Sequence, residues 1–111
     1  MKTVIVINQE GMGSGDPELG KKILKTFFTK APAAFRELEA IVFYNGGVRC
    51  LVEGSEFLPA LSTLSEHGVA LIACGTCVDA FELRDRIRVG AVGSMDEILK
   101  ELEAAAKVIT L

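Results

Sequence analysis

The sequence predicts an α/β fold, a three-layer α/β/α sandwich around a mainly parallel sheet of about five strands. Short, continuous apolar runs, which are typical of strands covered on both faces, alternate along the chain with amphipathic helical patterns. The connections between them are short, and this repeated strand-then-helix order favours parallel pairing with helices on both faces of the sheet. With 111 residues the chain is long enough for one core, so we expect a single domain over residues 1–111.

Five segments are predicted to form the strands. Four of them are continuous apolar runs that contain no glycine, proline, Asn or Asp. The fifth contains Gly90 and is followed closely by Gly93, which weakens its strand pattern. In chain order, the predicted strands cover residues 3–7, 40–44, 69–73, 88–92 and 108–110.

The first helix is predicted over residues 17–29. Asp16 can cap it, and Pro17 stands at the first helical position, where a missing N–H is harmless. One stripe of this helix is apolar and is expected to face the core. Its members are Leu19, Ile23, Leu24, Phe27 and Phe28.

A second helix is predicted over residues 56–66, between Ser55 as its cap and Gly68 as its stop. Pro59 falls within its first turn, where proline is tolerated. The last helix begins with a capping box formed by Ser94 and Glu97. Its stripe is expected in the core and consists of Met95, Ile98, Leu99 and Leu102. Shorter helices are expected over residues 46–52 and 78–83.

Composition excludes several classes of partner. Charged residues make up 24% of the chain, are mixed in sign and leave a net charge of -3, so no basic cluster favours nucleic acid or an anionic membrane. The N-terminal segment has four consecutive apolar residues, too few for a signal-peptide core or a membrane span. We therefore expect a cytoplasmic protein.

Two of the three cysteines form a C-x-x-C motif at a predicted strand-to-helix corner. Cys74 and Cys77 directly follow the apolar run 69–73. In a reducing compartment such a pair is more often catalytic or metal-binding than structural. A helix N-terminus can also lower the pKa of a cysteine, which favours the nucleophilic thiolate. Cys50 has apolar neighbours and is interpreted as a small buried hydrophobe.

The cysteine corner is expected to border a shallow pocket. Ligands of parallel sheets collect beyond the carboxyl ends of the strands, and the predicted loops at those ends are rich in glycine. Cys74 and Cys77 are the candidate catalytic residues. The candidate pocket residues are Asn8, Gly13, Ser14, Tyr44, Asn45, Gly46, Gly75 and Thr76.

The spacing of the glycines disfavours nucleotide binding, and the spacing of the candidate ligands disfavours metal binding. The glycines of residues 11–15 do not match a dinucleotide loop, and Asp16 and Glu18 would repel phosphate. His67 and Cys50 could complete a zinc site with the C-x-x-C pair, but a second closely spaced ligand pair is missing. We expect no cofactor and no bound metal. A thioredoxin-type dithiol exchanger stays open, although all three prolines precede the cysteines.

Three motifs carry a family resemblance over essentially the full length. They are Phe43-Tyr44-Asn45-Gly46-Gly47-Val48, the turn Cys74-Gly75-Thr76-Cys77, and the small-residue segment Val89 to Met95 before the last helix. With them, the chain resembles the DsrE/DsrF-like family, and within it is most similar to the C-terminal domain of the YedF selenium-metabolism proteins.

The resemblance implies a cytoplasmic sulfur-relay or sulfurtransferase-like protein, often a homo-oligomer built from trimers. It implies that Cys74 carries a persulfide, received from a donor protein such as a TusA-like carrier and passed to an acceptor, with selenium as a possible substitute for sulfur. The resemblance also implies that a cysteine at the position of Cys77 is not general in the family but occurs in the subset with the Cys-Gly-Thr-Cys motif. Two alternatives stay open: a dithiol-disulfide oxidoreductase that uses Cys74 and Cys77, and a non-catalytic interaction subunit with the same fold.

Overall fold

The computed structural model describes residues 2–111 and is built on one five-stranded sheet. All four strand pairings are parallel, and the strand order is β4-β3-β2-β1-β5. The predicted parallel sheet of about five strands is confirmed. The strands are β1 (Thr3–Ile7), β2 (Leu38–Phe43), β3 (Ala70–Cys74), β4 (Ala91–Gly93) and β5 (Lys107–Thr110).

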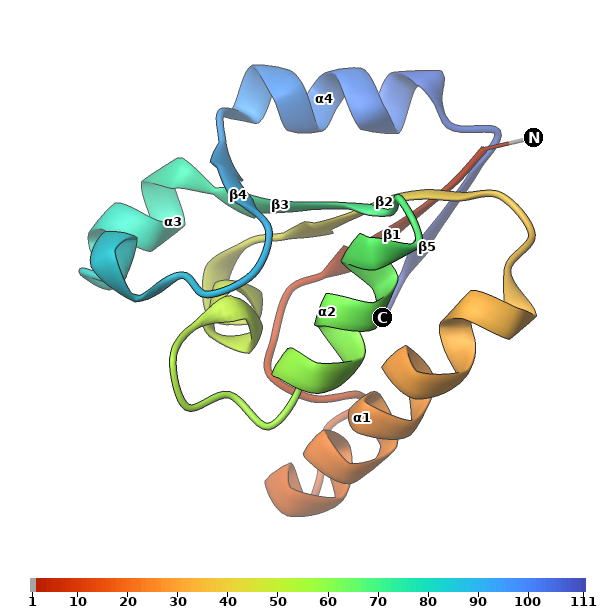
Figure 1. Ribbon diagram of the computed structural model, residues 1–111. Helices are drawn as coiled ribbons and strands as arrows, with labels where there is room; N and C mark the ends of the chain where they lie inside the picture. Colours follow the sequence, from red (N-terminus) through yellow and green to blue (C-terminus); the bar gives the residue numbers. More distant parts are fainter. Residues whose placement is uncertain (1) are drawn as a thin grey trace.

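Helices cover both faces of this sheet and make three layers, as predicted (Figure 1). One face carries α1 and α2, whereas α4 lies alone across the other face (Figure 1). The short α3 follows β3 directly at one end of the sheet. The helices are α1 (Pro17–Ala34), α2 (Leu58–Glu66), α3 (Gly75–Ala80) and α4 (Met95–Ala104), with two 3₁₀ helices, η1 (Asn45–Leu51) and η2 (Arg84–Arg86). None of the helices within residues 2–111 has the length and apolar character to cross a membrane.

Two of the three predicted N-caps are present, those of α1 and α4, whereas α2 begins at Leu58 with Phe57, not Ser55, in the cap position and without a side-chain cap hydrogen bond. The Asp16 carboxylate accepts the Glu18 backbone N–H at 3.0 Å at the start of α1. At the start of α4, the Ser94 hydroxyl accepts the Glu97 N–H at 3.2 Å, and the Glu97 carboxylate accepts the Ser94 N–H at 3.4 Å. Each cap satisfies backbone donors that a helix leaves unpaired. Local sequence chemistry therefore fixes where these two helices begin.

Several predicted segments differ from the structure in their bounds, among them β4 and α1. The strand expected over residues 88–92 is β4, which begins only at Ala91. Gly90 has a left-handed backbone (φ 78°), and Arg88 donates its N–H to the Leu51 carbonyl at 2.8 Å, outside the sheet. The helix α1 extends five residues beyond its predicted end at Thr29 and includes Pro32 in its last turns.

The core consists of two clusters, one on each face of the sheet. The larger cluster lies under α1 and α2 and includes Phe28, Phe43 and Leu61. The smaller cluster lies under α4 and consists of Val4, Val6, Ala40, Val42, Cys74 and Ile98. Burial of these apolar side chains is the main term that holds the layers together.

Some side chains expected in the core lie at the surface. On α1, Leu19 and Ile23 are 54% and 42% exposed. On α4, Met95 and Leu99 are 50% and 54% exposed, and Ile98 is the buried residue of that helix. A helix that touches the sheet along one line buries only that line, so the residues beside it stay open to solvent.

Candidate functional site

The predicted strand-to-helix corner lies at the carboxyl end of β3. Cys74 is the last residue of the strand and the cap residue of α3, which begins at Gly75. A Cβ atom on Gly75 would lie 3.3 Å from the Gly93 carbonyl oxygen and 3.4 Å from a Val92 methyl group. A small residue therefore allows β4 to pass close to the corner. Thr76 is exposed on the first turn of α3.

All three cysteines are free thiols, and their exposure differs. Cys50 is completely buried, as predicted. Cys74 is 3% exposed and packs in the cluster under α4. Cys77 is partly exposed. Within the corner, Cys77 is thus the thiol that solvent reaches more readily.

Cys77 is held by a donor from another loop. The Asn45 backbone N–H donates to the Cys77 Sγ at 3.1 Å, across 32 positions of sequence. The pKa of Cys77 is raised, first by burial and then by interaction with the Cys74 thiol, while the Asn45 N–H acts in the opposite direction. The expectation that the helix N-terminus lowers the thiol pKa is wrong for Cys77, because partial burial outweighs the local donors.

The turn that supplies this donor is fixed by close backbone packing. Asn45 has a left-handed backbone (φ 51°), a conformation that Asn tolerates better than most residues. The Tyr44 N–H donates to the Ile7 carbonyl at 3.1 Å. Gly47 lies so close to that carbonyl that an added Cβ would overlap it. The Asn-Gly-Gly sequence therefore lets η1 approach the end of β1.

Some of the residues predicted to line the pocket lie near one another in the structure. An added Cβ on Gly46 would lie 4.0 Å from the Asn8 carbonyl oxygen, so these two loops are adjacent. Tyr44 packs against the same small cluster as Cys74 and Cys77. Gly13 and Ser14 instead line a hollow of about 330 Å³ beside α1, whose walls within the described residues include neither cysteine.

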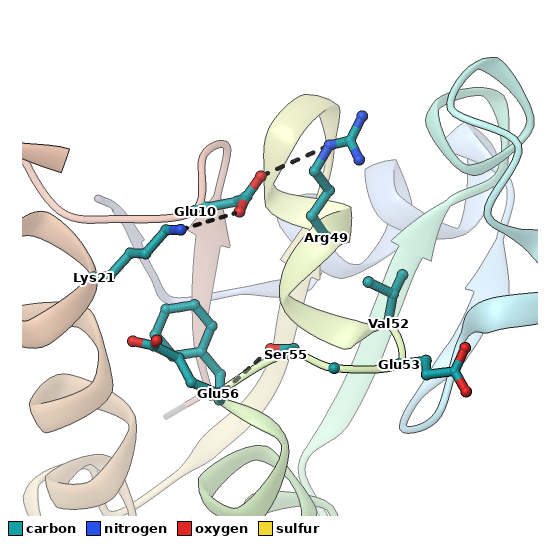
Figure 2. A pocket seen from close by; sticks show the side chains of 9 residues that line it. Glu10, Lys21, Arg49, Val52, Glu53, Ser55 and Glu56 are labelled. Atoms are coloured by element: carbon teal, nitrogen blue, oxygen red, sulfur yellow. Dashed lines mark hydrogen bonds and ion pairs between the residues drawn. The ribbon is translucent and has the colours of Figure 1, made fainter. Parts of the chain in front are cut away.

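A charged hollow of about 310 Å³ lies outside the site predicted from the sequence (Figure 2). The Glu10 carboxylate lies between two cations there, 4.0 Å from the Lys21 ammonium and 3.7 Å from the Arg49 Nε. The Arg49 guanidinium also lies 4.4 Å from the centre of the Phe81 ring, which follows α3. The sequence carries no signal for this group, because its members come from separate segments that only the fold brings together.

The other charged neighbours of the corner pair with each other. Arg84 binds both carboxylate oxygens of Asp79, at 2.7 and 3.0 Å. Hydrogen bonding to Arg84 lowers the pKa of Asp79, and the same bonds raise the pKa of Arg84. Both side chains are exposed at the surface.

His67 and Cys50 are not arranged as metal ligands with the C-x-x-C pair. The His67 Nδ1 lies 2.7 Å from the Thr63 carbonyl oxygen at the end of α2. Cys50 lies in the core, where burial and the Glu10 charge raise its pKa to about 12. Within residues 2–111, no three His, Cys, Asp or Glu side chains converge as a metal site would require.

Comparisons with known proteins agree with this architecture. The model of the DsrE/DsrF-like family matches residues 1–111. The search of curated proteins gives no significant match. Among solved structures, the chain is similar to the ychN protein of E. coli, with 20% identity, a TM-score of 0.74, and coverage of 99% of this chain and 98% of that one.

Two further solved structures share the fold. One is a protein of unknown function, MTH1491, from Methanobacterium thermoautotrophicum, with 22% identity, a TM-score of 0.72, and coverage of 99% of this chain and 98% of that one. The other is a conserved protein of unknown function, BT1422, from Bacteroides thetaiotaomicron, with 16% identity, a TM-score of 0.68, and coverage of 99% and 94%.

Proposed function

The chain belongs to the DsrE/DsrF-like family, and from that premise we propose that it is a sulfur-relay protein that holds a sulfane sulfur on Cys74. The observation that carries the proposal is the placement of two interacting free thiols at the carboxyl end of β3, one buried and one partly exposed. The carboxyl end of a parallel sheet is where such folds bind their ligands. The proposal also covers selenium, which would use the same pair of thiols.

Burial of Cys74 suits a residue that stores a labile group. A persulfide in water is open to attack by any free thiol, because exchange rates depend on access to the sulfur. Cys74 is only 3% exposed and belongs to the apolar cluster under α4, together with Val42 and Ile98. A sulfur atom held there is shielded until an acceptor thiol reaches the corner.

We further propose the setting of this relay. A cytoplasmic location keeps both thiols reduced between cycles. The sulfur donor and acceptor are proteins with an accessible thiol, among which a TusA-like carrier fits, and the chain works as a homo-oligomer based on trimers. The exposed apolar residues Met95 and Leu99 on α4 support a partner subunit, because such side chains are favoured at interfaces.

Intact mass spectrometry tests the proposal. The reduced protein is incubated with glutathione persulfide, desalted and weighed. We expect the wild-type chain to gain the mass of one sulfur atom and the double variant Cys74→Ser/Cys77→Ser to gain none. Cys50→Ala serves as the matched control and keeps the gain, because Cys50 lies in the core. A wild-type chain that remains at its original mass contradicts the proposal.

A dithiol-disulfide oxidoreductase is the second candidate, because the Cys74 and Cys77 thiols interact directly. The same experiment separates the two functions. Loss of two hydrogen atoms without any sulfur gain, together with turnover of a disulfide substrate, supports the oxidoreductase. A chain that shows neither change is the third alternative, an interaction subunit that has the fold without the chemistry.

A further inference from the structure

The two thiols of the corner differ in access, and this difference sets an order of reaction. Cys74 is 3% exposed beneath α4, whereas Cys77 lies one turn further along the chain and is partly exposed. A donor persulfide carried by another protein must approach from outside. It therefore meets the Cys77 Sγ before the Cys74 Sγ.

Cys77 also has a fixed backbone donor. The Asn45 N–H points at the Cys77 Sγ from 3.1 Å. A donor in this position stabilises the thiolate over the thiol. Its place is built into the fold, because the left-handed Asn45 begins η1 and η1 is packed against the Ile7 carbonyl through Gly47. An orientation held by packing does not need to be reorganised during the reaction.

From this geometry we infer that Cys77 is the receiving thiol of the relay and Cys74 the storing thiol, with Asn45 as the positioning residue of Cys77. The inference rests on the proposed function and deepens it, since it assigns separate roles to the two cysteines. It reverses the simplest mechanism, in which the donor would deliver its sulfur directly to Cys74.

The transfer has two balanced steps. Cys77 loses its proton to water, its thiolate bonds to the terminal sulfur of the donor persulfide, the donor S–S bond breaks, and the donor leaves as a thiolate. Cys74 then loses its proton to water, its thiolate attacks the outer sulfur of the Cys77 persulfide, and that S–S bond breaks. Cys77 is released as a thiolate and takes up a proton. The moving sulfur keeps its oxidation state, so the relay needs no oxidant or reductant.

Single variants loaded with glutathione persulfide test this order. We expect Cys74→Ala to gain one sulfur, located on Cys77 by peptide mapping. We expect Cys77→Ser to gain sulfur at least about tenfold more slowly than the wild-type chain, because the two remaining thiols, Cys50 and Cys74, are buried. Loading of Cys77→Ser at the wild-type rate, with no loading of Cys74→Ala, overturns the inference. Cys74→Ala is chosen because alanine suits the apolar surroundings of Cys74.

Alkylation with iodoacetamide decides the order without any sulfur donor. In the native, reduced chain we expect Cys77 to react at least about tenfold faster than Cys74, and in denaturant we expect the two rates to converge. A faster reaction at Cys74 overturns the assignment. Absence of sulfur uptake by the wild-type chain instead overturns the proposed function, so the two failures are distinguishable.

The role of Asn45 has its own readout, the pH at which Cys77 alkylation reaches half its maximal rate. Cys74 is the titratable neighbour that acts on Cys77. Asn45→Gly keeps the backbone N–H and suits the left-handed conformation, so we expect this midpoint to stay in place. Asn45→Val opposes that conformation and displaces the N–H, so we expect the midpoint to rise. Equal midpoints in the two variants contradict the positioning role.

Discussion

Cys50 has a different chemistry from the two site thiols because the core surrounds it. Burial, with a smaller effect of the Glu10 charge, raises its pKa from an ordinary 9.0 to about 12. The folded chain therefore keeps a proton that the unfolded chain loses above 9.0. The stabilisation from this thiol is complete below 9.0 and is lost as the pH rises through the window between 9.0 and about 12.

This linkage gives a measurable pH dependence. Between about pH 8 and about pH 10, we expect the free energy of unfolding of the wild-type chain to fall by about 1.4 kcal/mol more than that of Cys50→Ala. Denaturant titrations of both chains at the two pH values measure the difference. If the free energy of unfolding falls equally in the two chains, the Cys50 thiol has the same pKa in the folded and unfolded states, which contradicts the prediction.

Gly47 is a second residue whose role depends on its surroundings, because they leave no room for a side chain. A Cβ at this position would overlap the Ile7 carbonyl oxygen. We expect Gly47→Ala to lower the free energy of unfolding by at least about 2 kcal/mol, since backbone must move to relieve the overlap. Gly46→Ala is the matched control in the same turn, because its nearest contact is an ordinary 3.7 Å. Equal losses of stability in the two variants would contradict the steric explanation.

For individual residues of the site, the sequence predicts the residue type better than the exposure of its side chain. The C-x-x-C spacing and the strand-to-helix corner are local features, and both are present in the structure. The burial of Cys74 depends on Ile98 and Val42, which are distant in sequence and reach it only through α4 and β2. For the same reason, the ion pairs of Glu10 with Lys21 and Arg49 could not be predicted from the sequence. Such properties arise from tertiary packing and have no local signature.

Among the helices, α4 begins with a capping box. Its capping box satisfies two backbone donors, one at Ser94 and one at Glu97. We expect Ser94→Ala to lower the free energy of unfolding by about 1 kcal/mol. Ser65→Ala, at an exposed position within α2, is the control and is expected to change it by less than about 0.5 kcal/mol. Thermal or denaturant unfolding of the three chains measures both effects, and equal stability of all three would rule out a stabilising cap.

Element type follows the sequence closely, whereas element ends depend on the fold. β1 has the predicted bounds because its apolar run is flanked by polar residues. β4 is shorter than predicted because Gly90 turns the chain and Arg88 bonds to Leu51 outside the sheet. The short helix expected over residues 78–83 begins earlier, at Gly75, because β3 passes directly into it.

In the whole molecule, the two faces of the sheet are covered unequally. Two helices lie on one face, and α4 lies alone on the other with Met95 and Leu99 half exposed (Figure 1). Val108 on the edge strand β5 is 44% exposed as well. The proposed oligomer would cover such apolar surface, because its burial is favourable by about 25 cal/mol per Å².

We therefore expect Leu99→Lys to shift the protein toward the monomer in multi-angle light scattering. Leu19→Lys is the matched control, since Leu19 has the same exposed fraction but lies on α1, in the opposite layer. It is expected to leave the oligomer intact. A wild-type chain that is strictly monomeric at micromolar concentration would remove the proposed assembly, and loss of assembly in the control alone would move the interface to α1.

The position of β1, between β2 and the edge strand β5, has a consequence for synthesis in the cell. β1 is the first strand to be made, yet one of its two neighbours, β5, is the last. One edge of β1 therefore stays without its hydrogen-bonded partner until residues 107–110 have left the ribosome. The nascent chain cannot complete this sheet before β5 has emerged, and a chaperone that shields an unpaired strand would act during this interval.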